Sequence, residues 1–182
     1  MTSIALSARV RSADQMFTNS IATLGPPSTP YGHRMDKPNT ASIAEITDAD
    51  VPAVIALWQR CELTRPWNDP ASDIAFARRG ENSTILVARL DGAVVATAMV
   101  GHDGHRGWVY YVAVEPDRRG TGLGRTIMMA AEDWLRRRGV LKVMLMVRPE
   151  NTKVQAFYET LDYEEEERVI FAKWLDGRER MA

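Results

Sequence analysis

From residue 41 onward, apolar positions recur with two different periods, and each period predicts a different kind of element. Alternating or continuous apolar runs predict strands, whereas apolar residues spaced three and four apart predict amphipathic helices. In chain order, the expected elements are a strand at 41–46, helices at 51–61 and 71–79, strands at 84–90, 93–100 and 108–114, a helix at 123–138, a strand at 140–147, a helix at 151–161 and a strand at 163–174.

Polar residues and glycines mark the ends of several of these elements. Thr47, followed three positions later by Asp50, has the spacing of a capping box. Asp91-Gly92 is a typical hairpin turn, and Gly139 suits the left-handed residue that follows a helix. Asn151 is a favourable N-cap for the last helix.

The order of the elements predicts a mixed α/β fold of the α+β kind, in which most of the sheet is antiparallel. The helix at 123–138 joins the strands at 108–114 and 140–147, and a right-handed crossover of this kind makes two strands parallel. We therefore expect a central parallel pair of strands and helices on both faces of the sheet. The predicted domain is 41–176, preceded by a turn-rich, poorly ordered extension at 1–40 and followed by a tail at 177–182.

Composition excludes several broad classes of protein. The chain has 182 residues, of which 45% are apolar and 26% charged, and this suits one globular domain. A net charge of −1 argues against general nucleic-acid binding, and no apolar run approaches the ~20 residues that cross a bilayer. The single cysteine, Cys61, favours a cytoplasmic protein, and no Cys/His cluster has the spacing of a metal site. We expect no nucleic-acid or membrane partner and no metal, and we leave a homodimer open.

The segment Arg118-Arg-Gly-Thr-Gly-Leu-Gly-Arg125, called the glycine turn below, lies between a predicted strand and a predicted helix. Its alternate glycines let the backbone approach a ligand closely. The start of the helix adds unpaired N–H groups and the positive end of a dipole, which favour a phosphate. Walker-type and dinucleotide-binding motifs are absent, because no Gly-Lys-Ser/Thr is present and no Gly-x-Gly-x-x-Gly follows the first strand. The segment is therefore a candidate pyrophosphate site, with a tight turn that binds nothing as the alternative.

With its surroundings, the glycine turn resembles the motif of the GNAT superfamily of acetyl-CoA-dependent N-acetyltransferases. Arg119-Gly-Thr-Gly-Leu-Gly124 fits the pattern Arg/Gln-x-x-Gly-x-Gly/Ala, and the Val-x-Pro-like Val114-Glu-Pro116 precedes it. The resemblance covers roughly residues 42–175. Two further stretches, 63–70 and 103–107, resemble the YpeA-like subgroup of that family.

A second pattern of the family is an Asn, a Tyr seven residues later and a Leu-Gly-Phe/Tyr turn. Asn151, Tyr158 and Leu161-Asp-Tyr163 match it in spacing. The chain departs from the pattern at Asp162, where the family has the turn glycine, and at Val154, where a small residue is common. These departures bear on local packing more than on the cofactor motif.

The resemblance implies that acetyl-CoA binds as a cosubstrate. Backbone N–H groups of the glycine turn would hold its pyrophosphate, and its pantetheine arm would lie along the strand at 108–114 like an added strand. The resemblance also implies that this strand parts from its parallel neighbour there. A plain buried strand is the alternative for 112–114, and both can hold. The implied cofactor-binding residues are Val112, Ala113, Val114, Arg119, Gly120, Thr121, Gly122, Leu123, Gly124, Arg125 and Asn151.

Tyr158 is the candidate catalytic residue. In direct acetyl transfer a neutral amine attacks the thioester and a thiolate leaves, and a nearby phenol can hydrogen-bond or protonate that thiolate. The alternative is an ordinary core tyrosine, since Phe157 beside it shows that aromatic packing is available.

The acceptor side is less defined by the sequence. Asp103 and His105 are candidates for the base, although an Asp/Gly/His-rich turn is more often only a hairpin, and water relayed from backbone carbonyls is an equal alternative. The family's acceptor groove usually forms after the first helix, where Asp69 would bind an amine or simply cap the next helix. The substrate-binding candidates are Trp67, Asn68, Asp69, Asp103, His105 and Tyr110.

These features predict a cytoplasmic N-acetyltransferase that moves an acetyl group to a primary amine in a ternary complex. The acceptor would be a small molecule or a peptide. Two alternatives stay open: a protein N-terminal or lysine acetyltransferase, and a non-catalytic module that binds acyl-CoA.

Overall fold

A computed structural model of the chain describes residues 41–177. The predicted extension at 1–40 and residues 178–182 of the predicted tail lie outside the described residues. No helix within 41–177 combines the length and apolar character that crossing a membrane requires.

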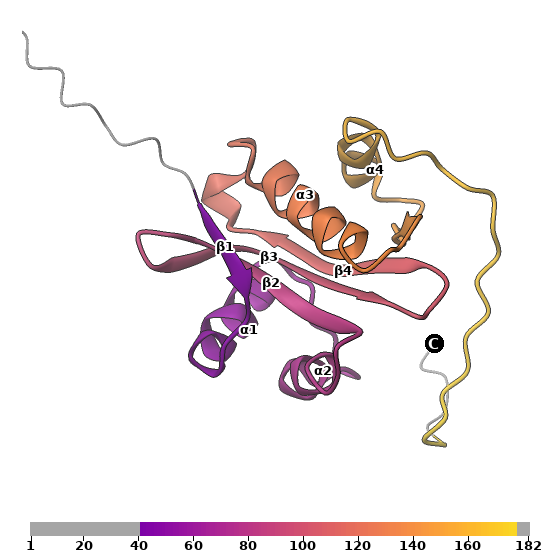
Figure 1. The fold of residues 1–182 in the computed structure, drawn as a ribbon, viewed down its shortest axis with the longest axis horizontal. Helices are drawn as coiled ribbons and strands as arrows, with labels where there is room; N and C mark the ends of the chain where they lie inside the picture. Colours follow the sequence, from indigo (N-terminus) through magenta and orange to yellow (C-terminus); the bar gives the residue numbers. More distant parts are fainter. Residues whose placement is uncertain (1–40, 178–182) are drawn as a thin grey trace, which may run out of the picture. The chain divides into compact units, whose positions relative to one another are not determined.

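The sheet has five strands in the order β1-β2-β3-β4-β5. Neighbouring strands are antiparallel except β4 and β5, which are parallel as the intervening helix predicts. Figure 1 shows the long β2–β3–β4 meander that forms the body of the sheet. The predicted mixed fold and its parallel pair are therefore confirmed, but the pair lies at the edge of the sheet instead of its centre, because no further strand among the described residues pairs with β5. The strands are β1 (Ser42–Glu45), β2 (Ser83–Leu90), β3 (Ala93–His102), β4 (Gly107–Val114) and β5 (Val143–Met144).

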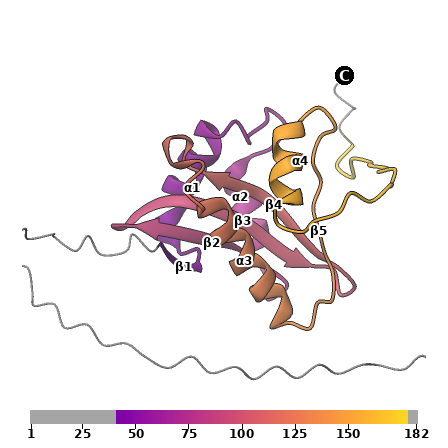
Figure 2. The ribbon, with the colours of Figure 1, turned by 90° about the horizontal axis from the view of Figure 1, so that it is seen from above.

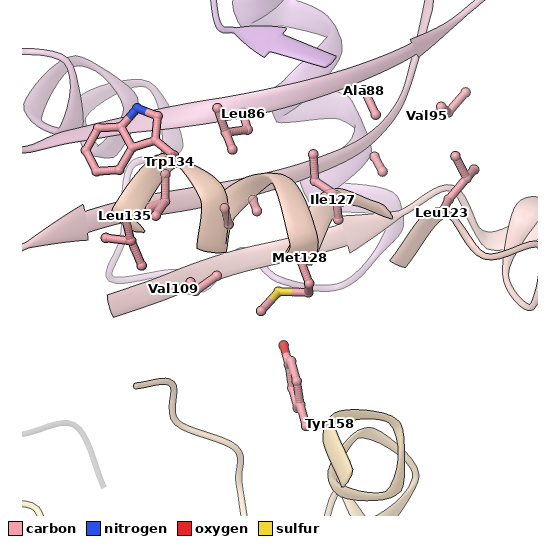
Figure 3. Packing of buried hydrophobic residues seen from close by; sticks show 14 of the residues in the cluster. Leu86, Ala88, Val95, Val109, Leu123, Ile127, Met128, Trp134, Leu135 and Tyr158 are labelled. Atoms are coloured by element: carbon pink, nitrogen blue, oxygen red, sulfur yellow. The ribbon is translucent and has the colours of Figure 1, made fainter. Parts of the chain in front are cut away.

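Helices cover both faces of the sheet, as Figures 1 and 2 show. One face packs against α1 and α2 and forms a core around Trp58 and Ile74. The other packs against α3 and α4 and forms a core around Ile127 and Trp134 (Figure 3). The helices are the short 3-10 helices η1 (Asp48–Asp50) and η2 (Pro116–Arg118), and α1 (Val51–Arg60), α2 (Pro70–Ala77), α3 (Leu123–Arg136) and α4 (Thr152–Glu159).

Most predicted helix ends are confirmed. The Asp50 carboxylate accepts hydrogen bonds from the Thr47 N–H at 2.7 Å and from its hydroxyl at 2.6 Å. Gly139 and Asp162 follow helices with φ of 76° and 63°, the left-handed conformation expected there. Asn151 occupies the N-cap of α4, but its side chain makes no capping hydrogen bond. The expectation that this side chain caps the helix is therefore wrong.

Two expected strands differ from the structure. The strand predicted at 140–147 is confined to Val143–Met144, where β5 pairs with Gly107 and Trp108. A β-bulge further along β4 changes the direction of that strand, so residues after Met144 have no strand beside them.

The strand predicted at 163–174 is absent from the structure. Glu164–Glu167 are four adjacent like charges with no apolar side chain to place on a sheet face. The segment after them leaves the sheet, and Val169 and Phe171 are 81% and 91% exposed. A β-rich composition does not form a strand without a neighbour for its backbone groups.

Candidate active site

The glycine turn has an open backbone, as its residue types predict. Gly120 and Gly122 have φ of 79° and 89°, and a Cβ on either one would meet no atom within 4 Å. No described residue accepts a hydrogen bond from the backbone N–H groups of residues 120–125. These unpaired donors stand at the N-terminus of α3, where the helix dipole is positive. The arrangement is suited to an anion.

The third glycine of the turn, Gly124, is required for close helix packing and not for a left-handed backbone. A Cβ on Gly124 would lie 3.0 Å from Cζ and 3.2 Å from Cε2 of Phe157. Gly124 therefore lets α4 pack closely on the first turn of α3. Arg125 strengthens the same contact, because its guanidinium donates a 2.7 Å hydrogen bond to the carbonyl of Thr160 at the end of α4.

The arginines at the turn are not equivalent. The Arg125 guanidinium is occupied at α4, whereas Arg119 is exposed and forms no ion pair with any residue of 41–177. Glu115, four residues before it, accepts hydrogen bonds of 2.9 and 2.6 Å from Arg60. That bidentate bond is the main reason the pKa of Glu115 lies below its usual value. Arg119 is thus left available for a phosphate.

Strand β4 has a free edge next to the turn. Its register with β3 runs as far as Val114, but its register with β5 covers only Gly107 and Trp108. Within the described residues, 112–114 therefore have a strand on one side only. The parting of the parallel strands that the resemblance implies is present, and the free edge continues directly toward the glycine turn.

Tyr158 lies on the α3 side of the sheet. It is 9% exposed, and its ring contacts those of Phe157 and Tyr163 at centroid distances of 5.1 and 5.6 Å. Figure 3 shows its hydroxyl directed toward Met128. That hydroxyl makes no hydrogen bond with any described residue, and burial raises the pKa of the phenol to about 12. The Asn151 carboxamide at the start of α4 is exposed and also unbonded among these residues.

Asp69 and Asp103 both bind the backbone near them. Asp69 accepts from the N–H groups of Ala71 and Ser72 and caps α2. Oδ1 of Asp103 accepts from two N–H groups of its own turn, and Oδ2 accepts from the Trp108 indole at 3.1 Å. The backbone bonds hold the pKa of the Asp103 carboxyl far below its usual range, which makes this anion a poor proton acceptor. His105 is exposed on the same turn.

A β-bulge in β4 places two adjacent tyrosines on one face of the sheet. The register shifts between Thr97 and Met99 of β3, and Tyr111 opposite has a φ of 48°. Tyr110 and Tyr111 consequently both face the pocket beside α2, where a regular strand would place them on opposite faces. The sequence analysis did not single out Tyr111. The signal was the tyrosine pair in the middle of an otherwise regular strand.

Buried polar contacts fix the bulge. The Trp58 indole donates to the Thr97 hydroxyl at 2.9 Å, and that hydroxyl donates to the Tyr111 carbonyl at 3.2 Å. Trp58 also stacks on the Tyr111 ring, with centroids 4.0 Å apart and the planes inclined by 17°. A left-handed non-glycine residue is strained, and these contacts hold Tyr111 in that conformation.

The Tyr111 hydroxyl connects β4 with α2. It donates a 2.7 Å hydrogen bond to Oδ2 of Asp73 and accepts one of 3.2 Å from the Asn68 amide. Burial is the main reason the pKa of Tyr111 lies above its usual value. Asp73 was also missed in the sequence, because it lies 38 residues from its partner and no local pattern connects them.

These side chains border an open cavity of about 340 Å³, called the acceptor pocket below. Of the predicted substrate-binding residues, it brings together Asn68 and Tyr110, but not Trp67, Asp69, Asp103 or His105. Trp67 is 39% exposed. No three His, Cys, Asp or Glu side chains within residues 41–177 gather closely enough to bind a metal. The pocket is lined by Asn68, Asp73, Phe76, Ala77, Ser83, Met99, Val100, Gly101, Tyr110 and Tyr111.

A turn with unpaired N–H groups follows a strand with a free edge in a sheet of this order, and this arrangement agrees with the resemblance to acyl-CoA-dependent transferases. Residues 51–163 match the model of the Acetyltransferase (GNAT) family. The chain belongs to that family and is an acetyltransferase.

Relatives and solved structures agree with this assignment. An acetyltransferase of Yersinia enterocolitica is 42% identical over 127 residues, which cover 70% of this chain and 90% of the relative. One from Pectobacterium atrosepticum is 44% identical over 126 residues, with 69% and 89% covered.

Two solved N-acetyltransferases share the fold. The aminoglycoside acetyltransferase AAC(6')-Iy, in complex with a CoA-containing bisubstrate analogue, has a TM-score of 0.64 at 21% identity, and the match covers 74% of this chain and 97% of that one. Glucosamine-6-phosphate N-acetyltransferase of Arabidopsis thaliana has a TM-score of 0.59 at 22% identity, with 75% and 99% covered.

Proposed function

We propose that the protein transfers the acetyl group of acetyl-CoA directly to a primary amine in a ternary complex. The observation that carries this proposal is the continuity of two unpaired backbone surfaces. The free edge of β4 at 112–114 leads into the unpaired N–H groups of residues 120–125. Acetyl-CoA has a matching shape, with a pantetheine arm that carries amides and a pyrophosphate at its far end.

The residues of the site fit acetyl-CoA. Gly120 and Gly122 have open space where a Cβ would stand, so a pyrophosphate can approach the backbone. Arg119 would add a positive charge, and the unbonded Asn151 carboxamide would add a polar contact. When bound, acetyl-CoA supplies an activated acetyl group on a thioester. The side chains of Val112 and Val114 stay packed against the α3-side core, while their backbone would orient the pantetheine arm.

Tyr158 would act as the general acid in this reaction. A pKa of about 12 keeps its phenol protonated at neutral pH, so Oη holds a proton for the leaving sulfur. Its hydroxyl has no competing partner among the described residues. Tyr158 and the acceptor pocket belong to opposite faces of the sheet, and the free edge of β4 separates them. An acyl group at that edge would have the acid on one side and the amine on the other.

Two experiments on the full chain test the proposal. Isothermal titration with acetyl-CoA measures cofactor binding, and a thiol-release assay with a panel of small amines and lysine-containing peptides measures transfer. Binding together with CoA release on small amines supports the proposed function. Release on peptides alone would favour a protein acetyltransferase, and binding without release would favour a non-catalytic module. Absence of acetyl-CoA binding would overturn the proposal as a whole.

A further inference from the structure

The acceptor pocket contains one charged side chain, the carboxylate of Asp73. We propose that Asp73 binds the acceptor in its ammonium form, which loses one proton to water before the neutral amine attacks the thioester, and that the acceptor is a small monocation with an apolar or aromatic body. This inference rests on the proposed function, because it names the substrate class of the same site. Asp73 would be a binding residue, and Tyr111 and Asn68 would position it.

The Asp73 carboxylate has no cationic partner within the described part of the chain. It forms no ion pair with any Lys, Arg or His of residues 41–177. Its Oδ2 accepts the hydrogen bond from Tyr111, and Oδ1 accepts none from a described residue. A half-buried carboxylate beside aromatic rings is favourable only when it is hydrated or paired. A ligand cation in the pocket would supply the missing charge.

The carboxylate is also held in place. Its hydrogen-bond donor, Tyr111, is fixed by the Trp58 stack, by the Asn68 amide and by the bulge itself. A rigid partner orients a side chain without the loss of conformational entropy that a flexible one would suffer on binding. A carboxylate that only stabilised the fold would not require the open cavity that Asp73 lines.

The remaining lining defines the body of the acceptor. Phe76, Met99 and Tyr110 present apolar or aromatic surface, and aromatic faces favour a cation nearby. Phe76 already has the Arg79 guanidinium 5.1 Å from its ring centroid, which leaves Tyr110 and Tyr111 as the aromatic faces for a ligand. About 340 Å³ is at the small end of the range for ligand pockets.

The pocket is not built for a polycation. The two other carboxylates among the predicted substrate-binding residues, Asp69 and Asp103, accept hydrogen bonds from backbone N–H groups of their own loops. Neither lines the pocket. A ligand with several ammonium groups would place one at Asp73 and the others against apolar side chains, where desolvation is unfavourable.

A binding experiment tests the inference independently of turnover. 2-Phenylethylamine, spermidine and the neutral 2-phenylethanol are each titrated calorimetrically into the full chain saturated with CoA. We expect 2-phenylethylamine to bind more tightly than the other two. Asp73→Asn should weaken its binding about tenfold to a hundredfold and leave 2-phenylethanol unchanged. Tyr111→Phe, which keeps the carboxylate and removes its hydrogen bond, should have a smaller effect in the same direction.

Asp69→Asn is the matched control, because it removes a nearby carboxylate that caps α2 and should not change the affinity for the amine. Equal affinities for 2-phenylethylamine in wild type and Asp73→Asn would overturn the inference, and so would tighter binding of spermidine. Thiol release measured in parallel separates the two proposals. Acetylation of amines with an unchanged preference in Asp73→Asn refutes the inference alone, whereas Asp73-dependent binding without CoA release refutes the proposed transfer.

Discussion

The glycine turn follows the end of β4 and the acceptor pocket lies against one face of the same strand, but the two are constructed differently. The turn is made by consecutive residues, and its chemistry comes from backbone N–H groups that the local conformation leaves unpaired. The pocket takes Asn68 from a loop, Asp73 from α2 and Tyr111 from β4, and its chemistry comes from side chains.

This difference has a consequence for specificity. A backbone site depends on φ angles and open space, so it suits a ligand that all members of a family share. A side-chain pocket changes with every substitution in its lining, so it suits a ligand that differs between members. Variants that damage one site and spare the other would therefore show whether the two are separable.

The largest effect is expected at the turn. Gly122→Glu would place a negative charge among the unpaired N–H groups, and acetyl-CoA affinity should fall by at least about a thousandfold. The fold should survive, because the new Cβ meets no atom within 4 Å, although the left-handed φ costs about 1–2 kcal/mol. Isothermal titration and thermal melting measure the two quantities. Gly122→Ala is the control for strain without charge, and wild-type affinity in the Glu variant would contradict the assignment.

A smaller effect, on kcat, is expected at Tyr158, which we place between the cofactor site and the acceptor pocket. Tyr158→Phe should lower kcat by about a hundredfold while the Kd for acetyl-CoA and the KM for the amine stay close to wild type. Because no described residue bonds to the hydroxyl, its removal should not destabilise the protein. Steady-state kinetics gives the answer. An unchanged kcat would remove Tyr158 from the reaction and leave it as a core residue.

The next effect in size is expected at Thr97, whose hydrogen bonds hold the β-bulge beside the acceptor pocket. Thr97→Val preserves shape but leaves the buried Trp58 N–H without its acceptor, so the free energy of unfolding should fall by about 1–3 kcal/mol. Loss of the bond to the Tyr111 carbonyl should loosen the bulge and raise the acceptor KM severalfold. Thr97→Ser retains the hydroxyl and should resemble wild type. A parallel change in acetyl-CoA affinity would mean that the two sides are not separable.

The smallest effect is expected on stability at low pH, through Asp50, with no change in the affinity for acetyl-CoA or for the amine. The guanidinium of Arg89 is the main reason the pKa of Asp50 falls from 3.8 to about 2. The folded state therefore binds this proton less readily than the unfolded state. The resulting stability, about 1–2 kcal/mol, is present above pH 4 and is lost as the pH falls toward 2.

Asp50→Asn should remove that acid dependence while both ligand affinities stay unchanged. Chemical denaturation at several pH values measures the effect. Asp48→Asn, in the exposed pair with Arg78, is the matched control and should change stability by less than about 0.5 kcal/mol. An identical acid dependence in the two variants would contradict the role of Asp50.

The sequence predicts features that consecutive residues build, but it does not predict contacts between residues far apart in the chain. The glycine turn, the parallel pair and the capping box depend on neighbours in the chain, and their residue types predicted them. Asp73 and Tyr111 meet only after folding, 38 residues apart, so periodicity could not associate them.

The wrong strand at 163–174 has a related cause. β-propensity describes a segment, whereas a strand also needs a neighbour whose position depends on the whole sheet. The prediction for 140–147 was too long for the same reason. The pairing of β5 covers two residues of β4, and the bulge that follows them belongs to β4. The prediction for Asn151 was wrong in another way, since the residue stands at the N-cap position but its side chain makes no capping hydrogen bond.

The contacts of Gly124 and Arg125 with α4 connect the glycine turn to the helix that carries Tyr158. The first turn of α3 therefore has two roles, since its N–H groups are unpaired among the described residues and residues 124 and 125 contact α4. Substitutions at 124 or 125 would alter cofactor affinity and the position of the phenol together. In a double-mutant cycle with Tyr158→Phe, such substitutions should be non-additive. Variation in this turn is thus constrained by both partners, and a new acyl donor would be easier to accommodate by changes farther along the free edge of β4.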